Sequence, residues 1–184
     1  MTEWNAIARR IRVPIGFVFS AVYLWLARPT PLSLAIGAAI VLPGLMIRAL
    51  ASGHVKKNEQ LTTSGPYAYT RNPLYLGSLV IGGGFAVAAR SWWIVSLMAL
   101  IFGAIYVPVI RSEELYLKSR FSEFAGYAEE VPRFLPRLSA ARPAKQQQGG
   151  FSWELYRKHR EYNAIVGSCS VMAVLIAKWL WASR

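Results

Sequence analysis

Between two long apolar runs of the chain stands the segment Gly65-Pro66-Tyr67-Ala68-Tyr69-Thr70-Arg71-Asn72-Pro73-Leu74-Tyr75-Leu76-Gly77. Gly65-Pro66 predicts a tight turn, because Pro66 fixes φ and Gly65 tolerates backbone conformations that other residues avoid. Pro73 disfavours helix at the residue before it and suits the first turn of a following helix. The tyrosines, arginine and asparagine between these stiff points suit a charged small molecule. A simpler alternative is an interfacial belt of Tyr and Arg at a helix start.

The apolar runs on both sides of this loop indicate an all-α integral membrane protein. Hydrophobic residues make up 54% of the 184 positions, which is high for a soluble domain of this size. About five runs are long enough to cross a bilayer if some tilt is allowed. The expected spans are Val13–Ala27, Leu32–Ala51, Leu74–Ala89, Trp92–Ile110 and Asn163–Trp181.

The net charge of +12 is spread along the ends of the apolar runs and does not form one patch. This distribution favours an anionic membrane surface over nucleic acid as the partner. Cys169 is the single cysteine, so it excludes an intramolecular disulfide. Neither His54 nor His159 has a second ligand at metal spacing, and we therefore predict no metal.

The distribution of Lys and Arg also predicts the topology. Basic residues precede the first run, flank the segment 65–77 and fill the region 111–160, whereas the opposite loops carry few. The positive-inside rule then places the segment 65–77 in the cytoplasm. We expect a bacterial inner membrane protein whose site faces the cytoplasm.

Two blocks of the sequence resemble the signature of membrane methyltransferases of the isoprenylcysteine carboxyl methyltransferase and phospholipid methyltransferase type. The first block is Gly65-Pro66-Tyr67 followed by Arg71-Asn72-Pro73-Leu74-Tyr75-Leu76-Gly77. The second comprises Arg111, Glu113, Glu114, Leu117, Phe121, Tyr127 and Val131-Pro132-Arg133-Phe134-Leu135-Pro136. The resemblance covers about Leu32 to Pro136, with Asn72 standing where many relatives have histidine.

This resemblance implies S-adenosylmethionine as the cofactor and a lipophilic methyl acceptor. An arginine suits the cofactor's carboxylate, a carboxylate pair suits its ammonium or ribose, and tyrosine faces suit its adenine or sulfonium. We expect Arg71 and Glu114 to act in catalysis. The expected cofactor-binding residues are His54, Gly65, Pro66, Tyr67, Arg71, Asn72, Pro73, Tyr75, Glu113 and Glu114.

Several alternatives remain open at this point. The Glu pair could be a solvated helix face, and His54 could be a solvated loop residue. A base for an amine or hydroxyl acceptor could be His54, Glu59, Glu113 or Glu114. The rival functions are an NADPH-dependent sterol-type reductase, which shares a similar motif, and a non-catalytic membrane scaffold.

The chain is expected to divide into three parts. Residues 1–138 would form the membrane methyltransferase core, with four transmembrane helices and a surface helix. Residues 139–150, rich in Gln and Gly, would be a linker. Residues 151–184 would supply an interfacial helix and a fifth span, which borders the acceptor's entry route and leaves the cofactor site intact when removed.

Overall fold

The computed structural model describes residues 16, 18–56, 60–141 and 150–183. It is all-helical, with 76% of residues in helices, and the part of the chain that it describes contains no strand. The predicted fold class, an all-α integral membrane protein, is confirmed.

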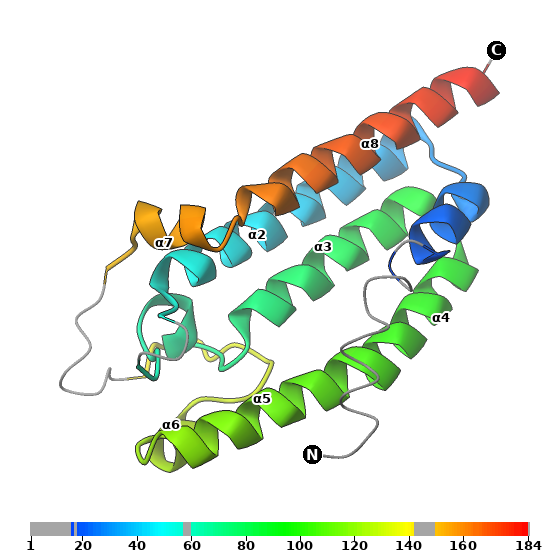
Figure 1. The fold of residues 1–184 in the computed structure, drawn as a ribbon. Helices are drawn as coiled ribbons and strands as arrows, with labels where there is room; N and C mark the ends of the chain where they lie inside the picture. The colour runs from blue at the N-terminus through cyan, green and yellow to red at the C-terminus, as the bar shows by residue number, and fades with distance from the viewer. Residues whose placement is uncertain (1–15, 17, 57–59, 142–149, 184) are drawn as a thin grey trace. The chain divides into compact units, whose positions relative to one another are not determined.

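Residues 18–26 are helical, and further helices follow along the chain (Figure 1). They are α2 (Pro31–His54), η1 (Gly65–Ala68), α3 (Pro73–Ala89), α4 (Trp92–Ile101), η2 (Phe102–Tyr106), α5 (Val107–Arg120), α6 (Phe124–Glu130), α7 (Trp153–Lys158) and α8 (Tyr162–Ala182).

Three helices are long and apolar enough to cross a membrane: α2 with 24 residues, the continuous helix Trp92–Arg120 with 29, and α8 with 21. At 1.5 Å per residue, even the shortest is about 30 Å long, which matches a bilayer core. Helix α3 is apolar but has 17 residues. The first expected span begins in residues 1–15, outside the described part, so a total of five spans stays a prediction.

The helix that starts at Trp92 runs further than the sequence analysis expected. The chain was expected to stay helical from Arg111 but to lie along the membrane surface there, and the structure has one helix from Trp92 to Arg120. Residues Phe102–Tyr106 form a π-helical segment, in which Val107 N–H donates to the carbonyl of Phe102. Pro108 explains this wide turn, because it has no N–H and removes one α-helical hydrogen bond.

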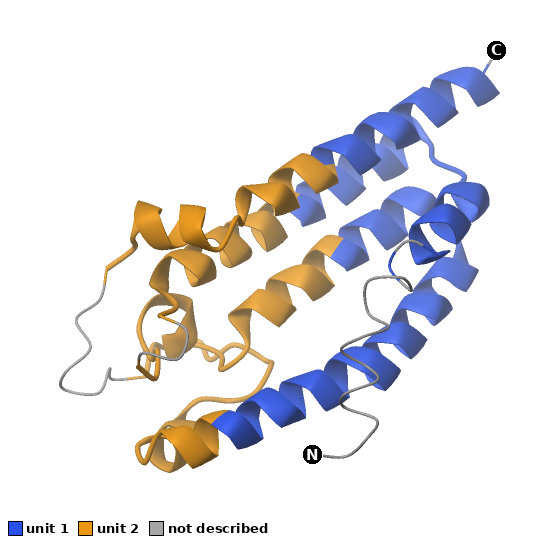
Figure 2. Ribbon diagram, viewed as in Figure 1, with its two compact units in different colours: residues 1–41, 82–116, 169–184 blue, residues 42–81, 117–168 orange. Residues whose placement is uncertain are grey.

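The described chain divides into two compact units (Figure 2). Unit 1 contains residues 1–41, 82–116 and 169–184, and unit 2 contains residues 42–81 and 117–168. The predicted division at residues 138 and 150 stays a prediction.

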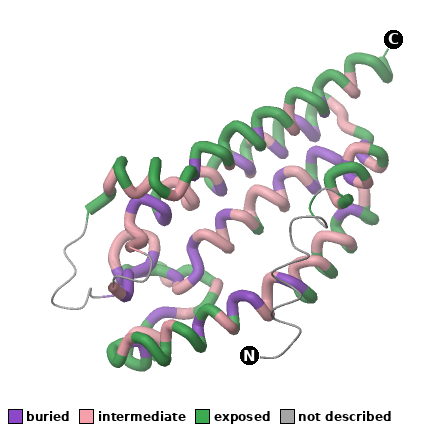
Figure 3. The backbone as a smooth tube through the Cα atoms, viewed as in Figure 1, coloured by how far each residue is buried: buried purple, intermediate pink, exposed green. Residues whose placement is uncertain are grey.

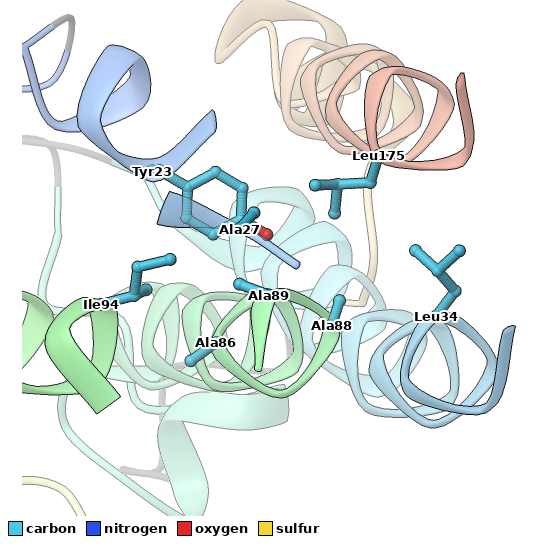
Figure 4. Packing of buried hydrophobic residues seen from close by; sticks show 8 residues of the cluster. All are labelled: Tyr23, Ala27, Leu34, Ala86, Ala88, Ala89, Ile94 and Leu175. Carbon is cyan, nitrogen blue, oxygen red and sulfur yellow. The ribbon is translucent and has the colours of Figure 1, made fainter. Parts of the chain in front are cut away.

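Unit 1 has a small apolar core in which alanines of α3 allow neighbouring elements to approach closely (Figure 4). The core residues are Tyr23, Ala27, Leu34, Ala86, Ala88, Ala89, Ile94 and Leu175. Polar contacts fix the elements around it. The Tyr23 hydroxyl donates to the Phe85 carbonyl at 2.9 Å. Lys178 of α8 donates to the carbonyls of Leu24 and Trp25 near the end of the first helix.

Unit 2 holds the parts of α2 and α3 that flank the loop, and glycines bring their backbones together. A Cβ at Gly77 would lie 2.8 Å from the Gly44 carbonyl oxygen and 2.6 Å from Arg48 Cγ. Both distances are shorter than real Cβ contacts, so only glycine fits at Gly77. Buried positions of this unit concentrate at the end of α2 and along the loop (Figure 3).

Candidate cofactor site

The loop from Gly65 to Asn72 is compact and largely inward-facing. Gly65 has φ +59°, a left-handed conformation that favours glycine, and Pro66 opens a short 3₁₀ turn. Tyr67 is buried in this turn, whereas Tyr69 is 40% exposed. The loop ends at Pro73, the first residue of α3. The turn and helix start predicted from Gly65-Pro66 and Pro73 are therefore present.

The segment 127–141 runs along the loop and fastens it through backbone hydrogen bonds. Arg71 N–H donates to the Pro132 carbonyl at 2.9 Å, and Arg137 N–H donates to the Tyr69 carbonyl at 3.0 Å. The Tyr127 hydroxyl donates to the Tyr67 carbonyl at 2.8 Å. The end of the second sequence block thus lies directly on the first, although more than 50 residues separate them in sequence.

Two buried polar side chains of the loop add hydrogen bonds to the junction between the loop and the segment 127–141. The Thr70 hydroxyl lies 3.2 Å from the Arg133 carbonyl oxygen and 3.1 Å from that of Phe134. The Asn72 amide nitrogen donates to the Arg133 carbonyl at 3.1 Å. Asn72 therefore has a positioning role that requires a side-chain N–H and no imidazole. Sequence reasoning had not assigned this role to either residue.

His54, the last residue of α2, lies against the start of the loop. A Cβ at Gly65 would come within 2.6 Å of its ring atoms Cδ2 and Nε2. Its Nδ1 lies 2.7 Å from the Leu50 carbonyl oxygen, which makes Nδ1 the protonated nitrogen and leaves Nε2 as the acceptor of the neutral ring.

The remaining predicted loop residues occupy the same unit. Pro73 is buried, and Arg71, Pro66 and Tyr75 are each partly exposed. The loop and the start of α3 therefore offer an arginine and a tyrosine that are partly exposed as whole residues, although the Arg71 Nε atom itself is buried. Such a donor set fits the carboxylate and the adenine or sulfonium of the expected cofactor.

The Glu pair belongs to unit 1. Successive residues of a helix point about 100° apart. The two glutamates of α5 therefore differ in exposure, and Glu114 is buried whereas Glu113 is exposed. Glu114 is therefore the better candidate of the two for contact with a ligand. Its juxtaposition with the loop, which lies in unit 2, stays a prediction.

Unit 1 also contains an open apolar hollow of about 550 Å³, with residues of the first helix and α4 on its walls. The lining residues are Trp25, Leu26, Trp93, Ser96, Leu97 and Leu100. A lining without charged groups suits an apolar chain and does not suit a zwitterionic cofactor. Among the described residues, no cluster of three or more His, Cys, Asp or Glu could hold a metal ion.

Sequence reasoning missed the polar contacts that surround Arg48 in unit 2: two polar side chains and one backbone carbonyl. The Arg48 guanidinium pairs with Glu161 and donates to the hydroxyl of Ser78 and to the carbonyl of Leu74. Arg48 therefore lies among polar groups of unit 2 although it belongs to an apolar helix. No local pattern pointed to Glu161, which is 113 residues away.

These features define a membrane-embedded helical protein with a hydrogen-bonded polar loop between α2 and α3. Residues 47–123 match the phospholipid methyltransferase family. The match contains the segment 65–77 and the Glu pair, and it confirms the predicted resemblance to the membrane methyltransferases of this type.

Individual relatives are similar to part of the chain. The cobalt-zinc-cadmium resistance protein CzcN of Cupriavidus metallidurans is 44% identical over 87 residues, which is 47% of this chain and 40% of CzcN. The nickel-cobalt-cadmium resistance protein NccN of Alcaligenes xylosoxydans xylosoxydans is 40% identical over 87 residues, covering 47% and 41%.

A protein-S-isoprenylcysteine O-methyltransferase of Schizosaccharomyces pombe is 28% identical over 102 residues, which is 55% of this chain and 43% of that enzyme. The chain thus spans about two fifths of the length of the curated relatives it matches. No solved structure matches it.

Proposed function

We propose that the protein is an S-adenosylmethionine-dependent methyltransferase that acts on a lipophilic acceptor at the cytoplasmic face of the membrane. The observation that carries the proposal is the fastened loop. Arg71 and two tyrosines stand on a backbone that the segment 127–141 holds at several points, within a region that matches a methyltransferase family. Alignment of reactants is the main requirement of methyl transfer, and a rigid loop serves it.

When bound, S-adenosylmethionine would supply an electrophilic methyl group. Arg71 would bind its carboxylate, and Tyr67 and Tyr75 would provide aromatic contacts. From the resemblance, Glu113 and Glu114 would bind its ammonium or ribose hydroxyls. A carboxylate acceptor requires no base, whereas an amine or hydroxyl acceptor would pass its proton to a neighbouring group, for which His54 Nε2, Glu113 and Glu114 are candidates.

The membrane location supports a lipophilic acceptor. Helices α2 and α8 expose large apolar side chains along their lengths, as expected of surfaces in lipid. A substrate that partitions into the bilayer reaches such a protein laterally. The names of the relatives suggest two acceptor classes, a phospholipid and an isoprenylcysteine carboxylate.

A non-catalytic role is the second candidate, because two relatives are named for metal resistance and not for methyl transfer. One experiment separates the candidates. Purified protein in lipid nanodiscs is incubated with methyl-labelled S-adenosylmethionine in two reactions. One reaction contains bacterial lipid extract as the acceptor, and the other contains an isoprenylcysteine analogue. We expect label in an acceptor with wild-type protein and a loss of at least tenfold with Arg71→Ala.

The matched control is Arg120→Ala, which removes an exposed arginine at the end of α5. If the protein binds the cofactor but transfers no label to either acceptor, the non-catalytic role becomes the favoured candidate. Oxidation of NADPH with a sterol, in place of methyl transfer, would establish the reductase alternative.

A further inference from the structure

The segment from Phe151 to Glu161, which we call the clasp, is attached to the end of α2. Ser152 N–H donates to the Gly53 carbonyl at 2.9 Å, and His159 Nδ1 lies 3.1 Å from the Ser52 carbonyl oxygen. The last carbonyls of a helix have no partner within that helix, so donors from a distant segment satisfy them here. The clasp therefore supplies hydrogen-bond donors to the C-terminal end of α2, although the two segments are far apart in sequence.

One contact connects the clasp to the beginning of the loop. The Phe151 ring covers Gly53, where a Cβ would overlap it, and its centroid lies 6.2 Å from that of His54. His54 in turn lies against Gly65. The Phe151 and His54 side chains thus form a continuous row that ends at the first residue of the loop.

A second contact connects the clasp to the other end of the loop. Glu161 is buried and pairs with Arg48 Nε, while Arg48 Nη1 donates to the carbonyl of Leu74 and to the hydroxyl of Ser78. Leu74 and Ser78 belong to the first turns of α3, directly after the loop. Glu161 thus orients the guanidinium that holds the start of α3.

We infer that the clasp sets the geometry of the loop 65–72, and that Phe151 and Glu161 are positioning residues for cofactor binding. The cofactor part of this inference rests on the proposed function. It departs from the sequence-based expectation that residues 151–184 are dispensable for the cofactor site. The reason is that the first residue of the loop and the start of α3, directly after the loop, both contact side chains that the clasp holds.

The ion pair of Glu161 and Arg48 should be disrupted by a single substitution, because each charge is the counter-ion of the other. Removal of the Glu161 charge leaves the Arg48 guanidinium, whose side chain is 25% exposed, without its counter-ion. Arg48 would then move towards water and release Leu74. Replacement of both members by apolar residues avoids this penalty but also removes the contact with Leu74.

The first test measures hydrogen exchange of the peptide that covers residues 65–72 in protein without ligand. We expect Glu161→Gln and Phe151→Ala to speed exchange there by at least tenfold. Glu154→Gln, an exposed glutamate of the same segment, is the matched control and should leave exchange unchanged. Unchanged exchange in both clasp variants would overturn the inference, whether or not the protein binds S-adenosylmethionine.

A second variant covers the case in which Glu161→Gln fails to fold. In Arg48→Met/Glu161→Leu, an apolar pair replaces the ion pair, so the helices remain packed while the contact with Leu74 is absent. We again expect at least tenfold faster exchange in the loop, and wild-type exchange would contradict the inference.

The cofactor arm uses calorimetry with S-adenosylmethionine. Phe151→Ala should raise Kd by at least fivefold, whereas Glu154→Gln should not. A wild-type protein that does not bind the cofactor would refute the proposed function, and the exchange result would still decide the inference about the clasp. Equal affinity of wild type and Phe151→Ala would refute the positioning role.

Discussion

Gly77, the last residue of the methyltransferase-like loop motif, should be intolerant even of alanine. A Cβ there would lie 2.8 Å from the Gly44 carbonyl oxygen and 2.6 Å from Arg48 Cγ. Arg48 can yield only by disturbing its contacts with Glu161 and Ser78. Overpacking of this kind costs about 1–3 kcal/mol.

Gly83 of the same helix provides the control, because no atom beyond the neighbouring backbone of its own helix lies within 4 Å of a Cβ built there. Alanine gains about 0.5–1 kcal/mol over glycine in a helix interior, and this gain applies to both sites. Gly83→Ala should therefore stabilise the protein. The difference between the two variants isolates the contact at Gly77, about 1–3 kcal/mol.

The assay is reversible unfolding in mixed micelles, followed by circular dichroism. For a chain of this size, 1 kcal/mol corresponds to about 2–4 °C in Tm, so the two variants should differ by roughly 2–12 °C. The same change in Tm for Gly77→Ala and Gly83→Ala would refute the close approach of α2 and α3 in unit 2.

Three further predictions concern the junction and the topology. Tyr127→Phe should lower the free energy of unfolding by about 0.5–1.5 kcal/mol, because the Tyr67 carbonyl loses its donor; Tyr162→Phe, at an exposed tyrosine, should have no measurable effect. Asn72→Leu should lower the free energy of unfolding by about 1–3 kcal/mol, whereas Asn72→His should lower it much less because the ring supplies an N–H. Equal losses in the two variants would contradict the positioning role of Asn72. In a cysteine-free background, a cysteine at Leu138 should be protected from impermeant reagent in intact cells and one at Ala182 should react, and the reverse labelling would overturn the cytoplasmic site.

The main helices follow from local features of the sequence. The apolar runs predicted from Leu32 and Asn163 correspond to α2 and α8 within a few residues. Gly65-Pro66 and Pro73 marked the turn and the helix start correctly, because proline and glycine act through their own backbone geometry. The family resemblance rested on residues of the loop itself, and the match over residues 47–123 confirms it.

The polar contacts around the loop could not be predicted in the same way. Glu161 and Arg48 are 113 residues apart, and no local sequence pattern around either residue indicates that they form a pair. The role of Asn72 depends on a carbonyl at Arg133, so it requires knowledge of which segment lies on the loop. Helical structure past Ile110 was expected, but the π-helical turn before Pro108, within one helix from Trp92 to Arg120, was not.

The central claim is that the loop binds S-adenosylmethionine through Arg71. Its most direct test is calorimetric titration of the cofactor into purified protein in nanodiscs, for wild type, Arg71→Ala and the control Arg120→Ala. We expect saturable binding to wild type and to the control. For Arg71→Ala we expect a loss of about 1.5–3 kcal/mol, equivalent to roughly 10- to 150-fold in Kd. Equal affinity of a well-folded Arg71→Ala protein would contradict the assignment of the loop, and no binding to wild type would contradict the proposed function.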